Sequence, residues 1–263
     1  MGEDLNEWLA VLGLILSLWG AVPTAVLFRE RVRGARSLRR MLALGPQKKI
    51  EFMVTSSRAD VSRVGPPQRE KRALRSLVPS GDLAGVAELG AMLSRAYPAK
   101  SFVVTPTGAS FANPEADHFV IGGPVRNDYA ARLIESCQDT AGITSGLIFD
   151  AGTRFIRFGT KEYGPDLDLD FSNNIPRLDY GIVMLAKVQR GPRSCRVLLV
   201  AGLTTYGTHA AAHFAAHQLV GYLKQNRLSR PPNVCVLIKA KLVNGRPYHL
   251  EAIGHLPGAV HTP

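Results

Sequence analysis

Cysteine is scarce in this sequence, and the common fingerprints of catalysis are missing from it. Three cysteines in 263 residues exclude a disulfide scaffold, and Cys137, Cys195 and Cys235 offer no CxxC spacing for zinc or redox chemistry. The chain also has no GxSxG turn, no HExxH motif and neither of the phosphate-binding fingerprints GxGxxG and GxxxxGK(S/T). The function therefore has to be argued from the order of strands and helices, from the charges and from individual turns.

Charge is absent from a run of 21 residues near the start of the chain, Trp8 to Phe28 (WLAVLGLILSLWGAVPTAVLF). At about 1.5 Å per residue, a helix of this length crosses a hydrocarbon core of about 30 Å. Acidic residues precede the run and arginines follow it, which is the reverse of a cleaved signal peptide. By the positive-inside rule, the arginine side faces the cytoplasm. We expect a single-pass protein of the cell membrane whose C-terminal domain is cytoplasmic.

Most of the net charge of +11 lies directly after this run. Residues 29–75 hold 14 Lys and Arg against four Asp and Glu, a net charge of +10. Apart from Phe52, no aromatic residue lies among these bases, so nucleic-acid binding is not expected. Contact with anionic lipid is the favoured interpretation. The bases expected to make it are Arg29, Arg31, Arg33, Arg36, Arg39 and Arg40.

Breaks in composition divide the chain into four parts. VGPPQREKR (64–72) has the Gly-Pro-Pro and charge pattern of a linker. The parts are a short extracytoplasmic N-terminus (1–7), a transmembrane helix (8–28), a basic juxtamembrane segment and linker (29–75), and a cytoplasmic α/β domain (76–263).

Strand and helix patterns alternate in the C-terminal part. Strands are expected there over residues 101–106, 117–123, 145–159 (a hairpin), 179–189, 194–202 and 233–254 (a hairpin turning at Asn244-Gly245), and helices over 81–97, capped by Ser80, 127–138 and 204–226. A further short strand is expected over residues 50–57, in the juxtamembrane segment before that part. CRVLLVAG is nearly continuously apolar, as expected of a strand buried on both faces. These patterns predict an α/β fold, a Rossmann-like three-layer mixed sheet with antiparallel edge strands.

Two strand–turn–helix units, HFVIGGPVRNDYAARLIE and RVLLVAGLTTYGTHAAAHF, are the candidate ligand site. Glycines let a ligand approach the backbone, and the N-terminus of the following helix favours an anion such as phosphate. The alternative is that the glycines serve tight turns and that Thr208 is only a helix cap. The ligand-binding candidates are Gly122, Gly123, Arg126, Asn127, Gly202, Thr204, Thr205, Gly207 and Thr208.

The motifs VIGGPVRN and AGLTTYGTHAA resemble those of Rossmann-like nucleotide-sensing modules in bacterial signalling and conflict systems. They are also similar to uncharacterised membrane-tethered bacterial proteins with a GGPxxN turn and a later GxxTYGTxAA turn. The resemblance covers about residues 100–225. It implies binding of a nucleotide or nucleotide-derived ligand at Gly122, Gly123, Asn127, Gly202, Gly207 and Thr208. It implies no catalytic residue.

Three histidines, His209, His213 and His217, recur every four residues and share one face of a helix. Adjacent pairs such as His209 and His213 could chelate a metal ion, and the alternative is a polar stripe on an alanine-rich helix. Asp166, Asp168 and Asp170 begin like a calcium loop, but Phe171 replaces the required glycine. No metal site is expected, and the sequence leaves the cofactor open.

Three functions follow from these patterns. The first is a membrane-anchored domain that binds a nucleotide-like anionic ligand for sensing or signalling. The second is a nucleoside or phosphate-ester hydrolase or glycosyl transferase, with Asp150, Glu135 or His209 as acid or base. The third is a membrane-associated structural or interaction protein. The sequence leaves the oligomeric state open.

Overall fold

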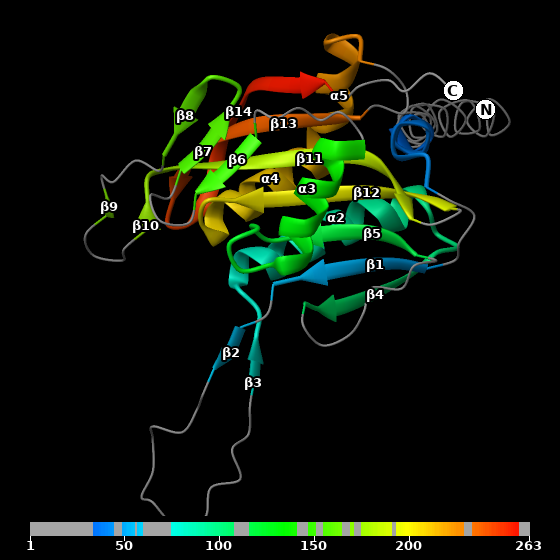
Figure 1. The fold of residues 1–263 in the computed structure, drawn as a ribbon, viewed down its shortest axis with the longest axis horizontal. Helices are drawn as coiled ribbons and strands as arrows, with labels where there is room; N and C mark the ends of the chain where they lie inside the picture. The colour runs from blue at the N-terminus through cyan, green and yellow to red at the C-terminus, as the bar shows by residue number, and fades with distance from the viewer. Residues whose placement is uncertain are drawn as a thin grey trace, which may run out of the picture.

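The chain folds around a seven-stranded β-sheet (Figure 1). This computed structural model describes residues 34–44, 49–55, 57–59, 75–107, 116–140, 147–150, 155–164, 169–170, 175–190, 193–228 and 233–257. From one edge to the other, the strands are β14 (Arg246–Pro257), β13 (Val234–Val243), β11 (Leu178–Arg190), β12 (Arg193–Gly202), β5 (Asp117–Ile121), β1 (Lys49–Val54) and β4 (Ser101–Pro106).

The sheet has a parallel half and an antiparallel half. β12, β5, β1 and β4 run parallel to one another, whereas β11, β13 and β14 continue from β12 with antiparallel pairing. The β13–β14 hairpin turns at Asn244 and Gly245, whose φ angles of 50° and 73° are the left-handed values of a type I′ turn. The expected α/β class with a mixed sheet and an antiparallel edge is confirmed, and it is consistent with a Rossmann-like arrangement.

Residues before position 76 belong to this sheet. β1 pairs with β5 on one side and with β4 on the other, and its side chains from Ile50 to Val54 are buried. The helical residues 34–42 place Leu38, Met41 and Leu42 in the same core. The folded unit thus includes residues N-terminal to position 76, and the linker pattern at 64–72 lies outside the described residues.

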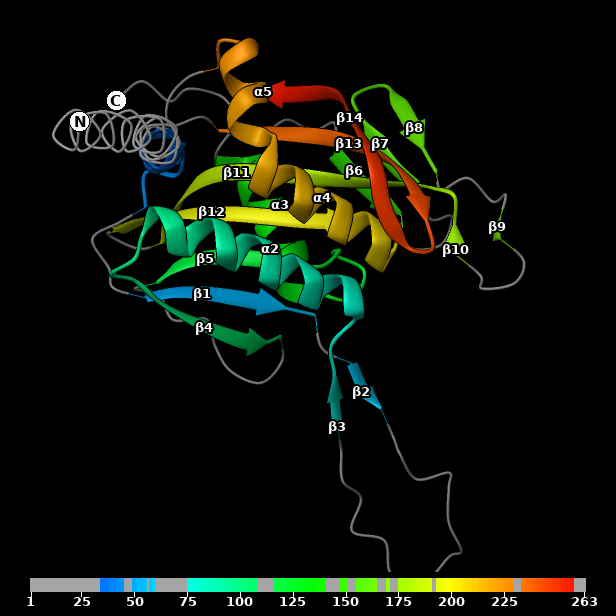
Figure 2. The same cartoon turned by 180° about the vertical axis from the view of Figure 1, so that it is seen from behind.

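Helices cover both faces of the sheet. α2 (Ser80–Ala96) and α4 (Thr205–His217) lie side by side on one face (Figure 2), and α3 (Asp128–Thr140) lies on the other (Figure 1). The α3 face also carries a small sheet of β6 (Leu147–Asp150), β7 (Phe155–Phe158) and β8 (Lys161–Tyr163), in which β6 and β7 form the expected hairpin. The remaining short strands are β2 (Ser57–Ala59), β3 (Arg75–Leu77), β9 (Leu169–Asp170) and β10 (Ile175–Pro176).

Two details of the helices differ from the expectations. The residue that caps α2 is Pro79, not Ser80, and it makes no side-chain cap. The single helix expected over residues 204–226 is divided, because the chain leaves helical geometry at Gln218 and a separate α5 (Leu219–Gln225) follows. Apolar periodicity continues through this break, so the sequence pattern alone does not reveal it.

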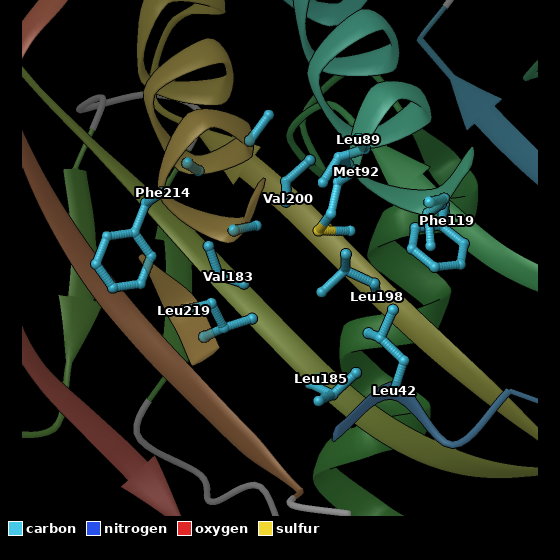
Figure 3. Packing of buried hydrophobic residues seen from close by; sticks show 14 of the residues in the cluster. Leu42, Leu89, Met92, Phe119, Val183, Leu185, Leu198, Val200, Phe214 and Leu219 are labelled. Atoms are coloured by element: carbon cyan, nitrogen blue, oxygen red, sulfur yellow. The ribbon is translucent and has the colours of Figure 1, made fainter. Parts of the chain in front are cut away.

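Each face of the sheet has its own hydrophobic core. On the α2–α4 face, Phe119 of the sheet packs with Leu89, Met92 and other aliphatic side chains (Figure 3), and Phe52 belongs to the same cluster. On the α3 face, side chains of β5, β11, β12 and β13 pack against α3 and the small sheet. Residues 195–202 of β12 are all buried, as expected of a strand covered on both sides.

The expected transmembrane helix, residues 8–28, lies outside the described residues, as do Arg29, Arg31 and Arg33. Within the described ranges, no helix has the length and apolar character needed to span a bilayer. Arg36, Arg39 and Arg40 lie on the helical residues 34–42 and are exposed. Arg39 also donates to the Ala96 carbonyl at the end of α2 and lies over the Tyr97 ring.

Candidate functional site

The carboxyl ends of β1, β5 and β12 form the region where a ligand is expected. β12 is followed by α4, and β1 by α2 after the short strands β2 and β3, both helices lying on one face of the sheet; β5 is followed by α3 on the other face. Neighbouring parallel strands with connections on opposite faces create the switch point at which open α/β sheets bind ligands. We call the residues there the carboxyl-end cluster: Thr55, residues 79–82, residues 122–127 and residues 202–208.

The two glycine turns lie against each other in this cluster. β5 and β12 pair in parallel up to Ile121 and Val200, so both turns begin at the same level of the sheet. A Cβ atom added at Gly123 would lie 2.9 Å from the Gly202 carbonyl oxygen. Any larger residue at position 123 would therefore push the turns apart.

Several of the residues expected to contact a ligand have contacts within the turns themselves. Asn127 is buried and caps α3: its Oδ1 accepts from the Ala130 N–H at 3.0 Å, and its Nδ2 donates to the Ile121 carbonyl at 3.3 Å. The Thr208 hydroxyl donates to the Thr204 carbonyl at 3.3 Å. Gly202 gives room to the backbone of Gly207 and Thr208, since a Cβ there would overlap both. These three residues serve the local structure, and ligand binding by them stays a prediction.

Thr204 caps α4 and donates a hydrogen bond to Asp179, a buried carboxylate that was not among the candidates expected from the sequence. Its Oγ1 accepts from the Tyr206 N–H at 3.1 Å and donates to Asp179 Oδ2 at 2.5 Å. The backbone N–H groups of Gly207 and Tyr180 also donate to Asp179, at 2.7 and 2.8 Å. Burial raises the pKa of Asp179 to about 6, although these hydrogen bonds lower it. An acidic residue at the start of an apolar strand was the only sequence signal for this role.

Thr205 connects two helices. Its Oγ1 accepts a hydrogen bond from the Gly81 N–H at 2.9 Å, so α4 supplies the side-chain cap that Ser80 was expected to give α2. A Cβ at Gly81 would overlap Thr205, so glycine is required there. The N-termini of α2 and α4 are thereby held together at the carboxyl ends of the strands.

Asp82 is the residue of the cluster whose hydrogen bonding is incomplete. Its side chain is 2% exposed, and its Oδ2 has no hydrogen-bond partner among the described residues. Burial raises its pKa to about 6, while hydrogen bonds from Thr55 lower it. Gly122, with a φ of +114°, lies directly beside this carboxyl group: a Cβ there would be 2.8 Å from Asp82 Oδ2 and would overlap Thr55. The only sign of Asp82 in the sequence is an acidic residue in the first turn of a helix, where such residues are common.

Arg126 is exposed in the turn between β5 and α3. Its backbone N–H donates to the Gly123 carbonyl, but within the described part of the chain no hydrogen bond or ion pair is found for its guanidinium. Its guanidinium can therefore pair with an anion that lies outside the turns.

None of the three acid/base candidates is among the residues of the cluster. Glu135 is exposed on α3, past its second turn. His209 lies on α4 with Nε2 4.0 Å from Glu88 Oε1, and burial, the largest of several effects, lowers its pKa. Asp150 ends β6 in the small sheet, and its side chain is outside the described set, as are Asp166 and Asp168.

A basic pocket of about 440 Å³ lies at the same end of the sheet, beyond β11. Lys239 and Lys241 alternate along β13 and line it together with Arg177, Asn244 and Tyr248. The pocket adjoins the carboxyl-end cluster, because Leu178 in its wall precedes Asp179. Two bases on one strand are an ordinary solvent-facing pattern, so these lysines carry no signal of a pocket in the sequence.

Comparisons of this chain with protein-family models, with curated proteins and with solved structures find no match.

Proposed function

We propose that the carboxyl-end cluster binds a nucleotide-like anionic ligand, and that the protein senses or signals that ligand while residues 8–28 anchor it in the membrane. The observation that carries this proposal is Asp82, a buried carboxyl group with one oxygen unpartnered among the described residues. A buried polar group without a partner costs about 1–3 kcal/mol, more if it is charged. A ligand that donates a hydrogen bond to Asp82 recovers that cost.

The chemistry around Asp82 favours a ligand with both hydroxyl and phosphate groups. A carboxylate accepts hydrogen bonds, so it selects a donor such as a sugar hydroxyl. The N-termini of α2, α3 and α4 begin in the same cluster, and their dipoles favour an anion. Arg126 adds a positive charge at the exposed side of the β5–α3 turn. A nucleotide combines these groups in one molecule.

A thermal-shift screen of the full-length chain in mild detergent tests this proposal. The probes are nucleotides, dinucleotides, NAD and sugar phosphates, each with and without Mg²⁺. A ligand at 100 times its Kd stabilises the protein by about 2.7 kcal/mol, or about 5–10 °C for a chain of this size. Asp82→Asn and Arg126→Ala should reduce the shift, and Arg95→Ala, an exposed arginine in the last turn of α2, should leave it unchanged.

Two other outcomes redirect the assignment. If no probe shifts the melting temperature of a well-folded protein, the ligand proposal fails and an interaction protein becomes the better assignment. If a probe binds but its thermal shift changes equally in Arg95→Ala and Arg126→Ala, the anion is bound elsewhere. The basic pocket is then the next location, and Lys239→Ala with Lys241→Ala tests it.

The raised pKa of Asp82 also favours a second candidate, an enzyme acting at the same cluster. A carboxyl group with a pKa of about 6 exchanges protons near neutral pH, as a general acid or base must. A hydrolase or glycosyl transferase would use Asp82, in place of Asp150, Glu135 or His209. Turnover of the bound nucleotide that is lost in Asp82→Asn would favour the enzyme, and binding without turnover would favour the sensor.

A further inference from the structure

A histidine–glutamate cluster joins α2 and α4 on the face of the sheet shown in Figure 2. Glu88 of α2 lies opposite the histidines of α4. Its Oε1 is 3.0 Å from His213 Nδ1, and its Oε2 is 2.8 Å from His217 Nε2. The His213 and His217 rings are 4.5 Å apart between centroids. The sequence placed these histidines on one helical face, but the carboxylate that completes the cluster comes from 125 residues earlier in the chain.

We propose that Glu88, His213 and His217 bind a divalent transition-metal ion of the zinc type. One donor atom from each residue lies within 4.8 Å of the other two. Zinc binds imidazole nitrogen and carboxylate oxygen at about 2.0–2.2 Å, so tetrahedral ligands lie about 3.3–3.5 Å from one another. Small rotations of partly exposed side chains bring these donor atoms to such distances. His213 and His217 lie one turn apart on the same helix, the spacing at which two imidazoles reach one ion.

An alternative is that Glu88 and the histidines lie together only to form ion pairs, but this explanation is weak. Glu88, His213 and His217 have side chains that are 27%, 37% and 48% exposed, so pairs between them contribute little in water. Full charge on both histidines would also place two positive rings side by side. A divalent ion satisfies the carboxylate and both imidazoles at once, with the imidazoles in their neutral form.

His209 extends the cluster toward the helix N-terminus. Its Nε2 lies 4.0 Å from Glu88 Oε1, and burial lowers its pKa, with His213 and Arg246 acting in the same direction and Glu88 opposing them. His209 and His217 are about 12 Å apart along the helix axis, so one ion does not bind both. We therefore assign His209 a supporting contact with Glu88. A solvent molecule would take the fourth position on the metal.

A metal at this position ties α2 to α4. The same two helices meet at their N-termini through the Gly81–Thr205 hydrogen bond. The ion would thus stabilise the helix pair that carries the carboxyl-end cluster. The metal site stands independently of the proposed ligand, since none of its three residues belongs to that cluster.

Metal titration of the full-length chain tests the site. The protein is prepared in mild detergent without a histidine tag, stripped with EDTA, and titrated with ZnCl₂ by calorimetry and with Co²⁺ by visible absorption. We expect one ion per chain and a rise in melting temperature of about 5–10 °C at 100 times the Kd. Glu88→Gln, His213→Ala and His217→Ala should each weaken binding by at least about 10-fold, since loss of even an outer partner of a metal ligand does so.

Matched variants separate the site from general effects. His249→Ala removes an exposed histidine on β14 and should leave the affinity unchanged. His213→Gln keeps a polar side chain if the alanine variant fails to fold, and it should still lose the metal. Absence of zinc binding by the folded wild-type chain would overturn the proposal. So would binding that survives in Glu88→Gln, His213→Gln and His217→Ala.

Discussion

Two buried aspartates at the same end of the sheet both have a raised pKa, but their hydrogen-bond partners differ. Asp82 and Asp179 both have pKa values raised to about 6 by burial. Asp179 accepts from the Thr204 hydroxyl and from the N–H groups of Tyr180 and Gly207, whereas Asp82 keeps one oxygen unpartnered among the described residues. A satisfied buried carboxylate holds a turn in place, and an unsatisfied one is available to a ligand. Burial and pKa alone therefore do not separate a structural group from a functional one, and the partners do.

The most destructive test of this comparison removes the satisfied carboxylate. Asp179→Ala leaves three donors without their acceptor at the N-terminus of α4. We expect the free energy of unfolding to fall by about 3–5 kcal/mol. Chemical denaturation of the full chain measures it, with Asp82→Ala for comparison. A loss below about 1 kcal/mol would show that the Asp179 hydrogen bonds do not hold the turn.

A smaller loss should come from the backbone next to Asp179. A Cβ at Gly207 would lie 2.8 Å from Asp179 Oδ2 and would overlap the Tyr180 carbonyl. We expect Gly207→Ala to cost about 2–4 kcal/mol, because backbone atoms cannot move aside as a flexible side chain can. Gly221→Ala on α5 is the control, since nothing lies within 4 Å of its added Cβ and alanine favours a helix by about 0.5–1 kcal/mol. Equal effects in the two variants would contradict the packing argument.

The third test uses pH to sharpen the comparison at Asp82. A carboxyl group whose pKa is 3.8 in the unfolded chain and about 6 in the folded one destabilises the folded state as the pH rises between these values. The contribution is absent below about pH 4 and complete above pH 6. Asp82→Asn should therefore raise the free energy of unfolding by about 1–2 kcal/mol at pH 7, with little effect at pH 4.

Denaturation midpoints of wild type and Asp82→Asn, measured from pH 4 to 8, give this difference directly. Asp179→Asn serves as the matched control, since it should destabilise at pH 7 by disturbing hydrogen bonds that need an acceptor. If Asp82→Asn destabilises the chain to the same extent, Asp82 has a structural role like that of Asp179, and the ligand proposal loses its main support.

The smallest expected effect concerns the hydrogen bond between the N-termini of α2, which carries Asp82, and α4, which lies beside Asp179. Thr205→Val keeps the shape of the side chain but removes the acceptor for the Gly81 N–H. We expect a loss of about 1 kcal/mol, the usual value for a helix cap. Ser80→Ala should have almost no effect, because Ser80 makes no cap. Hydrogen exchange at the start of α2 would report the loss at the Gly81 amide.

Much of the fold was predictable from local sequence. The strands at 101–106, 179–189 and 194–202 appear where alternation, apolar runs and turn residues placed them. The Asn244-Gly245 turn forms as its residue types predict. These features depend on neighbours a few residues away, so the sequence carries their signal directly. The break at Gln218 and the use of β1 in the sheet were missed because both depend on how distant segments pack.

The candidate sites divide in the same way. The sequence by itself determined which residues occupy the glycine turns and that three histidines share a helical face, since chain spacing sets both. Only the tertiary structure decided that the side chains of Asn127, Thr204 and Thr208 form hydrogen bonds within the turns. It also decided that Asp82 Oδ2 has no hydrogen-bond partner among the described residues and that Glu88 faces the histidines. Hydrogen bonds are set by which side chains packing brings within about 3 Å, and here α2 meets α4 across more than a hundred residues of chain.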